Sequence, residues 1–247
     1  MNPLGILGFG RFGQLLYKHL KNRVDLAVYD PYQRYQRKFS RVPFVELSRI
    51  ARMPHLILAV PVAAIEEVAR KLNPHIRSDA LVMDVCAVKT YPLQVLEKEL
   101  PSTVEIVGSH PLFGPDSAAD SFRNHILILS PVRIAAPRFQ MVRRFWQALG
   151  VQIVEMTPAE QDRLMAWSLA LTHFLGRALT RLPLPETPVS TRDYQNLLKL
   201  VAKINRDTVE LFQDMHRFNP YTREMRDVLY KSIADLKSEL DSIQKVE

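Results

Sequence analysis

The stretch Gly8-Phe9-Gly10-Arg11-Phe12-Gly13 decides the fold predicted for this 247-residue chain. It closes the apolar run Leu4-Gly5-Ile6-Leu7 and opens a pattern of helical spacing, so the local order is strand, glycine turn, helix. Gly8 permits a tight turn, Gly10 lets the backbone approach a pyrophosphate, and Gly13 lets the helix pack closely on the strand. The bare N–H groups at the start of that helix suit phosphate oxygens. The stretch therefore predicts a dinucleotide site, to which we also assign Arg11 and Phe12.

An acidic residue ends the next predicted strand, as a dinucleotide site of this kind requires. Asp30 follows the apolar segment 24–29, where a carboxylate accepts hydrogen bonds from the adenosine ribose. A carboxylate there repels the 2′-phosphate of NADP, so the sequence favours NAD. Arg34, Arg37 and Lys38 follow closely and are able to bind such a phosphate, which leaves NADP open as an alternative.

Strands and helices alternate through the first 155 residues. The further strands that we predict lie at 55–61, 80–85, 104–108, 125–130 and 151–155, with helical patterns over 46–53, 61–72 and 91–100 between them. This alternation is typical of an α/β fold with a doubly wound parallel sheet of the Rossmann type. Ligands bind beyond the carboxyl ends of such strands, so the connections that begin at Val60, Asp84 and Gly108 are expected to line one crevice. Val60 and Pro61 are accordingly assigned to the cofactor.

The third of these connections, Gly108-Ser109-His110-Pro111-Leu112-Phe113-Gly114-Pro115-Asp116-Ser117, carries a histidine at a predicted strand end. A neutral imidazole there can act as a general base, taking a proton from a substrate hydroxyl as hydride leaves the same carbon. The alternative is that His110 only hydrogen-bonds a loop carbonyl. Its expected position beside the nicotinamide favours the catalytic role. Asp116 either contacts the substrate or caps the following segment.

From Thr157 onward the strand pattern stops and long amphipathic patterns continue to the end of the chain. Thr157-Pro158-Ala159-Glu160 reads as the capped start of the first helix. The predicted helices run from Thr157 past His173 toward Leu182, from about Arg192 to Arg217, and from Thr222 to Val246. We therefore predict a dinucleotide-binding domain over 1–155 and an all-helical substrate and dimerisation domain over 156–247. Helices this long, with few others to cover them, indicate apolar faces that a second subunit completes.

The composition excludes several classes of protein. The net charge is +7 and the pI about 9.6, but the basic residues are scattered and no nucleic-acid motif accompanies them, so we expect a small anionic substrate and no nucleic acid. A single cysteine argues against a disulfide framework or a cysteine-ligated metal site, and we predict no metal. The sequence shows neither a signal peptide nor an apolar run near the roughly 20 residues of a membrane span. We therefore expect a cytoplasmic protein without membrane partners.

Through Gly108–Ser117 and Asp84-Val-Cys-Ala-Val-Lys89 the chain resembles the prephenate/arogenate dehydrogenase family of tyrosine biosynthesis. The resemblance extends to Gly8–Gly13, to Ala59-Val-Pro61 and to Thr172-His-Phe-Leu175. It implies NAD-dependent oxidative decarboxylation of prephenate to 4-hydroxyphenylpyruvate, or of arogenate to tyrosine. It also implies that the histidine of the motif contacts the ring 4-hydroxyl, and that the helical domain forms a homodimer. We expect no fused chorismate mutase or regulatory domain.

The resemblance assigns further residues to the substrate. His173 matches a position that approaches the substrate, and Arg206 aligns with an arginine that binds a substrate carboxylate, for which a planar guanidinium is suited. Spacing alone would make Arg206 a solvated helix residue paired with a neighbouring carboxylate. Ser109 and Asp116 complete the predicted substrate set.

Two positions depart from the family pattern. Ala87 stands where members commonly have a serine whose hydroxyl helps to position the histidine, and Gln161 lies in a segment where many relatives carry a histidine. The missing hydroxyl predicts slower turnover or an altered substrate. The alternatives are therefore a dehydrogenase of a related cyclohexadienyl compound such as 4-amino-4-deoxyprephenate, a 3-hydroxyacid dehydrogenase or imine reductase of the same architecture, and a non-catalytic NAD-binding protein.

Overall fold

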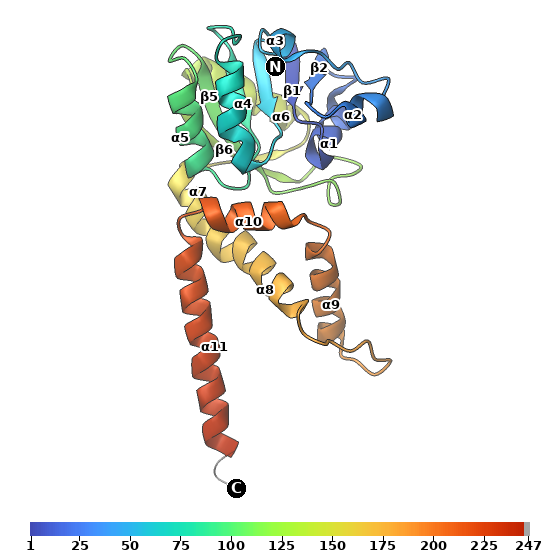
Figure 1. Ribbon diagram of the computed structural model, residues 1–247, viewed down its shortest axis with the longest axis vertical. Helices are drawn as coiled ribbons and strands as arrows, with labels where there is room; N and C mark the ends of the chain where they lie inside the picture. The colour runs from blue at the N-terminus through green and yellow to red at the C-terminus, as the bar shows by residue number, and fades with distance from the viewer. Residues whose placement is uncertain (245–247) are drawn as a thin grey trace. The chain divides into compact units, whose positions relative to one another are not determined.

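The computed structural model describes residues 1–244, which form two compact units (Figure 1). The first unit is Met1–Gln161, and the second, helical unit begins at Asp162. The division falls within helix α7 (Pro158–Met165), whereas the sequence places the domain boundary after residue 155.

The first unit is built on one seven-stranded sheet in the order β2-β1-β3-β4-β5-β6-β7. Its strands are β1 (Leu4–Leu7), β2 (Leu26–Tyr29), β3 (His55–Leu58), β4 (Leu81–Asp84), β5 (Glu105–Pro111), β6 (Ile126–Arg133) and β7 (Gln152–Glu155). Its helices are α1 (Arg11–Leu20), α2 (Gln33–Lys38), α3 (Leu47–Ile50), α4 (Ile65–Leu72), α5 (Thr90–Glu99) and α6 (Ala136–Ala148), with a 3₁₀ turn η1 (Val62–Ala64) before α4. The predicted doubly wound sheet is confirmed, and α6 is a helix that the sequence analysis did not identify.

One pair of strands, β5 and β6, is antiparallel, whereas the other neighbouring pairs are parallel. A parallel connection needs a crossover helix, and no helix lies between residues 111 and 126 of the described chain. The antiparallel ladder extends β5 beyond the predicted end at Gly108 and pairs His110 with Ile128. His110 therefore lies within a strand, and the prediction that placed it in a loop after the strand was wrong on this point.

The two faces of the sheet are covered by different helices, because successive side chains of a strand point to opposite faces. Ile57 belongs to a cluster that includes Leu16 of α1 and Trp146 of α6, all of them fully buried. On the other face, a Cβ on Gly5 would come within 2.8 Å of Ile50 in α3, and a Cβ on Gly108 within 2.7 Å of Leu93 in α5. The sheet is thus buried on both sides, which explains why its strands read as nearly continuous apolar runs.

The described residues of the second unit, 162–244, form helices and no strand, as predicted. A continuous helical run begins with α7, passes through a π-helical segment (Ala166–Ala170) and ends with α8 (Leu171–Leu179). The predicted cap is confirmed, because Glu160 N–H donates to Thr157 Oγ1 at 3.3 Å and Thr157 N–H donates to Glu160 Oε2 at 2.9 Å. These two bonds form the reciprocal capping box that the sequence pattern predicts.

The single helix predicted over 192–217 is two helices, α9 (Arg192–Ile204) and α10 (Val209–Phe218). The break occurs because Thr208 caps α10, its side chain accepting a hydrogen bond from Leu211 N–H at 3.1 Å. Arg206 consequently lies in the connection between two helices and not on a helix. The last helix, α11, spans Thr222–Gln244, and the predicted continuation to Val246 lies outside the described residues.

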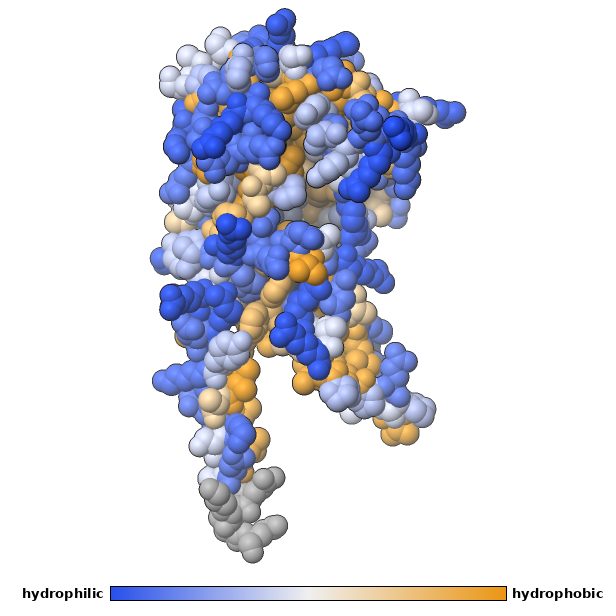
Figure 2. Space-filling view, in the orientation of Figure 1, coloured by the Kyte–Doolittle hydropathy of each residue, from blue (hydrophilic) through white to orange (hydrophobic). Residues whose placement is uncertain are grey.

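Helix α11 carries an apolar stripe on its exposed surface. Figure 2 shows apolar side chains along the lower, helical part of the view. The stripe consists of Ile233, Leu236, Leu240 and Ile243, which are each more than half exposed at 53%, 57%, 53% and 62%. Among residues 1–244, no helix combines the length and the apolar character needed to cross a membrane.

Candidate functional site

The glycine turn between β1 and α1 has the geometry that a dinucleotide site requires. Gly8 has a φ of +96°, and a Cβ on it would lie 2.3 Å from the carbonyl oxygen of Ala59. A Cβ on Gly13 would lie 2.1 Å from the carbonyl oxygen of Gly8, so α1 packs directly on the end of β1. A Cβ on Gly10, by contrast, would meet no described atom within 4 Å. The backbone is therefore bare at the one glycine where a pyrophosphate has to approach.

Asp30 is tied to this turn. One of its oxygens accepts a hydrogen bond from Phe9 N–H at 2.7 Å and the other from Tyr32 N–H at 2.8 Å, and the residue is buried. A carboxylate has about four lone-pair positions, so both oxygens keep capacity for ribose hydroxyls. The carboxylate thus joins the glycine turn to the end of β2.

The N-terminus of α1 suits phosphate groups. Within the described chain no side chain caps this helix and its first turn has no acidic residue. Unpaired N–H groups and the helix dipole favour an anion at such a position. Val60 and Pro61 follow the adjacent strand β3 and lie between it and η1. The open backbone at Gly10 and the uncapped start of α1 therefore fit a dinucleotide such as NAD.

Arg11 and Phe12, which open α1, contact the segment that follows β5. Arg11 forms an ion pair with Asp116 at 2.8 Å, and the ring of Phe12 lies 6.3 Å from that of Phe113. Both charged side chains are about half exposed, at 50% and 41%, so solvent weakens the pair. The structure thereby connects two groups of predicted site residues, those of the glycine turn and those of the motif around His110.

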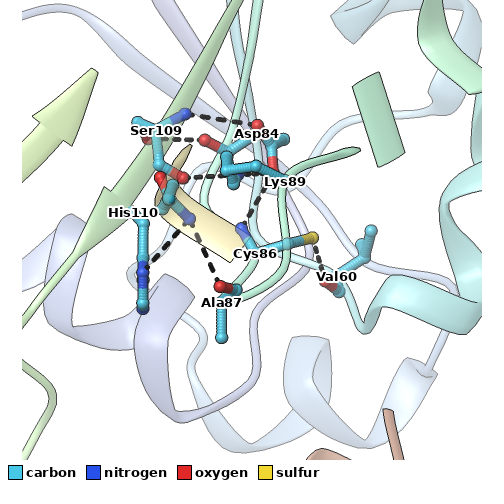
Figure 3. A network of polar contacts seen from close by, with 8 residues as sticks. Val60, Asp84, Cys86, Ala87, Lys89, Ser109 and His110 are labelled. Atoms are coloured by element: carbon cyan, nitrogen blue, oxygen red, sulfur yellow. Dashed lines mark hydrogen bonds and ion pairs between the residues drawn. The ribbon is translucent and has the colours of Figure 1, made fainter. Parts of the chain in front are cut away.

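A buried network joins the carboxyl ends of β4 and β5 (Figure 3). Lys89 forms an ion pair with Asp84, and both side chains are fully buried. Lys89 Nζ also donates to the carbonyl oxygen of Ser109 at 2.6 Å. Asp84 accepts from Ser109 N–H at 3.2 Å through its carboxylate, and from the Ser109 hydroxyl at 2.5 Å through its backbone oxygen. Ser109 is therefore held on three sides, and its hydroxyl is directed toward Asp84.

His110 follows directly on this network and is itself buried, with 6% of its surface exposed. Its Nδ1 lies 3.4 Å from Nε2 of Gln161, which also donates to the carbonyl oxygen of Ala87 at 3.3 Å. Burial lowers the pKa of His110 to about 3, and the nearby charge of Lys89 acts in the same direction. The imidazole is therefore neutral near pH 7, so that one ring nitrogen carries a proton and the other can accept a hydrogen bond.

The remaining predicted site residues lie in the helical unit. His173 in α8 is buried, and its Nε2 lies 3.7 Å from a carboxylate oxygen of Asp207. Burial lowers the pKa of His173, although the charge of Asp207 opposes this effect. Arg206, beside Asp207, is exposed in the α9–α10 connection, and its N–H donates to the carbonyl oxygen of Lys203 at 3.1 Å.

Three residues of the His110 environment, Asp84, Lys89 and Gln161, were named in the sequence analysis but were not assigned to the site. A carboxylate at the end of a fully apolar strand was a usable signal for Asp84, because a buried charge needs a partner. Lys89 could have been found as that partner. The described residues contain no group of three or more His, Cys, Asp or Glu side chains that is arranged to hold a metal ion.

Two models of known protein families match parts of the chain. Residues 34–155 match the family model described as prephenate dehydrogenase, nucleotide-binding domain. Residues 178–247 match the model described as TYRAAT1-like, C-terminal domain. The first match confirms the prediction of a nucleotide-binding fold.

Two curated relatives match along almost the whole chain. Arogenate dehydrogenase 2, chloroplastic, of Arabidopsis thaliana is 30% identical over 253 residues, which cover 96% of this chain and 69% of the relative. Arogenate dehydrogenase 1, chloroplastic, of the same plant is 29% identical over 248 residues. That match covers 96% of this chain but only 39% of the relative, so this chain spans well under half of that protein.

Solved structures share the fold. The prephenate dehydrogenase of A. aeolicus, in complex with hydroxyphenyl propionate and NAD+, has a TM-score of 0.81 at 21% identity and covers 99% of this chain and 92% of that one. The Synechocystis arogenate dehydrogenase has a TM-score of 0.68 at 23% identity, with coverage of 97% and 89%. Because arogenate dehydrogenase 2 is 30% identical over most of both lengths, the chain belongs to the prephenate/arogenate dehydrogenase family, whose members are NAD(P)-dependent oxidoreductases.

Proposed function

We propose that this chain catalyses the NAD-dependent oxidative decarboxylation of prephenate or arogenate in tyrosine biosynthesis, with His110 as the catalytic residue. The observation that carries the proposal is a buried, neutral histidine at the carboxyl end of β5, in the same unit as a glycine turn that suits a pyrophosphate. The family to which the chain belongs supports the reaction class.

The proposed reaction removes a hydride from the ring carbon that bears the hydroxyl group, and the ring carboxylate leaves as CO2. The electron pair of the broken carbon–carbon bond completes the aromatic ring, and the hydroxyl hydrogen remains on the phenol oxygen. When bound, NAD supplies the hydride acceptor. His110 forms a hydrogen bond with the ring hydroxyl and orients the carbon that loses hydride.

The network beneath His110 supports this role. Ser109 was predicted to bind the substrate, but we propose a positioning role for it, because it is fully buried and its hydroxyl, N–H and carbonyl groups all bond to the Asp84–Lys89 pair. A catalytic group is most effective when its supports are rigid and themselves hydrogen-bonded. Asp116, which pairs with Arg11, is proposed to lie at the edge of the substrate site.

The helical unit is proposed to supply substrate binding and dimerisation. Arg206 is assigned to a substrate carboxylate, because its guanidinium stays charged and presents paired donors. His173 is assigned to the same substrate. The exposed stripe of α11 is proposed as part of a homodimer interface. A cytoplasmic location stays a prediction of the sequence analysis.

The proposal is tested by following nicotinamide reduction with the purified chain. Prephenate, arogenate and 4-amino-4-deoxyprephenate are each offered with NAD and with NADP, and His110→Gln serves as the control. We expect turnover with NAD and either prephenate or arogenate, and a loss of about 10²- to 10⁴-fold in the variant. Turnover with 4-amino-4-deoxyprephenate alone, or NAD binding without turnover, would refute the proposed reaction.

A further inference from the structure

Among the described residues, only Gln161 forms a side-chain hydrogen bond with a ring nitrogen of His110. Its Nε2 lies 3.4 Å from His110 Nδ1. Gln161 is fully buried, and it stands on α7, far from β5 in the sequence. The orientation of this buried amide determines whether His110 Nδ1 faces a hydrogen-bond donor or an acceptor.

The carbonyl oxygen of Ala87 fixes which way the Gln161 amide points. This oxygen lies 3.3 Å from Gln161 Nε2 and can only accept a hydrogen bond. With the amide reversed, Oε1 would face the Ala87 oxygen, and two acceptors would oppose each other. The side chain of Ala87 has no polar atom, so the backbone of this residue alone sets the orientation.

The amide orientation in turn sets the tautomer of His110. Both hydrogens of the Gln161 amide are then used, one toward Ala87 and the other toward His110 Nδ1. A nitrogen that accepts a hydrogen bond carries no proton, so the proton of the neutral ring resides on Nε2. Gln161 Oε1 has no hydrogen-bond partner among the described residues, so no second contact draws the amide away from this orientation.

We propose that Gln161 is a positioning residue that fixes His110 as the neutral tautomer with its proton on Nε2, leaving Nδ1 as the acceptor nitrogen. This inference rests on the proposed function for its catalytic meaning, but the tautomer itself is a property of the folded chain. A second proton on His110 would have to enter at Nδ1, where it would oppose the N–H of Gln161.

The charges around His110 favour the neutral imidazole, as the Gln161 amide does. Lys89 is the charged group whose field reaches His110 among the described residues, and its positive charge disfavours an imidazolium. Asp84 is paired with Lys89 and bonded to Ser109, so its carboxylate is directed to those partners. From α7 the ring meets the uncharged amide of Gln161. Neutral His110 is thereby favoured from both sides.

A neutral histidine is compatible with the balance of the proposed reaction. Hydride leaves the ring carbon, CO2 leaves with the loss of one carbon–carbon bond, and the phenol retains its hydrogen, so no proton has to be taken up by the protein. His110 therefore serves as a fixed hydrogen-bonding group for the ring hydroxyl. With Nδ1 occupied by Gln161 and the proton on Nε2, His110 donates its hydrogen bond to the oxygen of the ring hydroxyl. It therefore positions the substrate and does not act as the general base that the sequence analysis expects.

The tautomer is tested by nitrogen NMR of the whole chain labelled with ¹⁵N-histidine. The chain has seven histidines, and the signals of His110 are those that disappear in His110→Gln. Between about pH 5 and 8, we expect one protonated ring nitrogen, Nε2, and one unprotonated ring nitrogen, Nδ1, with no titration. A proton on Nδ1, or titration of His110 within this range, would overturn the proposal.

Two variants separate the role of the Gln161 amide from a role in packing alone. Gln161→Glu keeps the shape but places an acceptor beside Nδ1, so the proton is expected on Nδ1 and the pKa of His110 is expected to rise by about 1 to 3. The pH profile of kcat/KM gains the corresponding ionisation. Gln161→Met keeps the length without a donor, and we expect kcat to fall about 2- to 10-fold with little change in the KM for NAD.

The outcomes distinguish this inference from the proposed function. NMR is recorded without substrate, so a fixed Nε2–H tautomer supports the inference even if neither prephenate nor arogenate is turned over. If Gln161→Glu and Gln161→Met both leave the tautomer and titration of His110 as in the wild type, Gln161 only fills space and the inference is wrong.

Discussion

Lys89 Nζ donates a hydrogen bond to the carbonyl oxygen of Ser109 at 2.6 Å, and neither residue is exposed to solvent. The same ammonium group is paired with Asp84, so the ends of β4 and β5 are joined by charge as well as by the sheet. His110 is the next residue along β5. The backbone position of His110 therefore depends on the Asp84–Lys89 ion pair, which forms no hydrogen bond with either ring nitrogen of His110.

Replacement of Lys89 by methionine is expected to destabilise the protein by about 3 to 5 kcal/mol, because Asp84 is left as an unpaired buried carboxylate. The double variant Asp84→Asn, Lys89→Met removes both charges and should be more stable than the single variant. Urea unfolding of the three proteins measures this difference. A double variant no more stable than Lys89→Met would show that the charge of Asp84 is not what makes the single change costly.

Gly10→Ala and Gly13→Ala form a matched pair at the glycine turn. A Cβ at Gly13 would lie 2.1 Å from a backbone oxygen, so α1 has to move and we expect a loss of about 1 to 3 kcal/mol of stability. A Cβ at Gly10 meets nothing within 4 Å, so stability should stay within about 0.5 kcal/mol.

The same pair should separate folding from cofactor binding. The added methyl group of Gly10→Ala occupies the place where the backbone approaches the pyrophosphate, and we expect the Kd for NAD to rise at least about tenfold. Urea unfolding and NAD titration by calorimetry provide the two readouts. Unchanged NAD affinity in Gly10→Ala would place the cofactor elsewhere.

The buried histidine predicts a loss of stability in acid. The pKa of His110 in the folded state is about 3, below the value near 6.5 of an unfolded chain, so the unfolded state binds more protons between these limits. The free energy of unfolding that depends on neutral His110 is fully present above about pH 6.5. It is lost as the pH falls toward about 3, by at most about 1.4 kcal/mol per pH unit. His110→Gln should therefore lose less stability on acidification than the wild type.

Urea unfolding of both proteins at several pH values measures this difference. His55, His173 and His216 also have lowered pKa values, with burial as the main cause. Their contribution to the loss of stability in acid is the same in both proteins. Parallel pH dependences of the two proteins would mean that His110 does not titrate differently on unfolding.

The stripe on α11 predicts a subunit interface that one charge can disrupt. Leu236→Lys places an ammonium group within the stripe and is expected to raise the dimer dissociation constant by at least about tenfold, because a buried charge needs a partner. Ser238→Lys adds the same charge on the opposite side of the helix and should leave the dimer intact. Sedimentation equilibrium provides the measurement, and a wild-type monomer at micromolar concentration would contradict the proposed interface.

Local patterns predicted most of the elements of this fold. The glycine turn, the buried strands and the Thr157–Glu160 cap each depend on residues close together in the sequence, and the structure confirms them. The break between α9 and α10 was missed because apolar residues continue at helical spacing through it. Thr208 was the available signal, since it is a strong capping residue.

Contacts between distant segments could not be predicted in this way. The antiparallel pairing that takes His110 into β5 depends on β6, and Pro111 and His110 by themselves suggest a loop. The contact between Gln161 and His110 joins residues 51 positions apart. The sequence therefore predicted that a histidine stands near the end of a strand. The protonation state of His110 and the residues that hold it in place could be found only from the structure.

The most direct test measures NADH and CO2 together in one reaction. Prephenate and arogenate, each labelled in the ring carboxylate, are incubated with NAD and either the wild type or His110→Gln, whose fold is checked by urea unfolding. We predict one labelled CO2 released for each NADH formed by the wild type, and a loss of both products by about 10²- to 10⁴-fold in the variant. NADH formed without CO2, or unchanged rates in His110→Gln, would contradict the assignment of an oxidative decarboxylase that acts through His110.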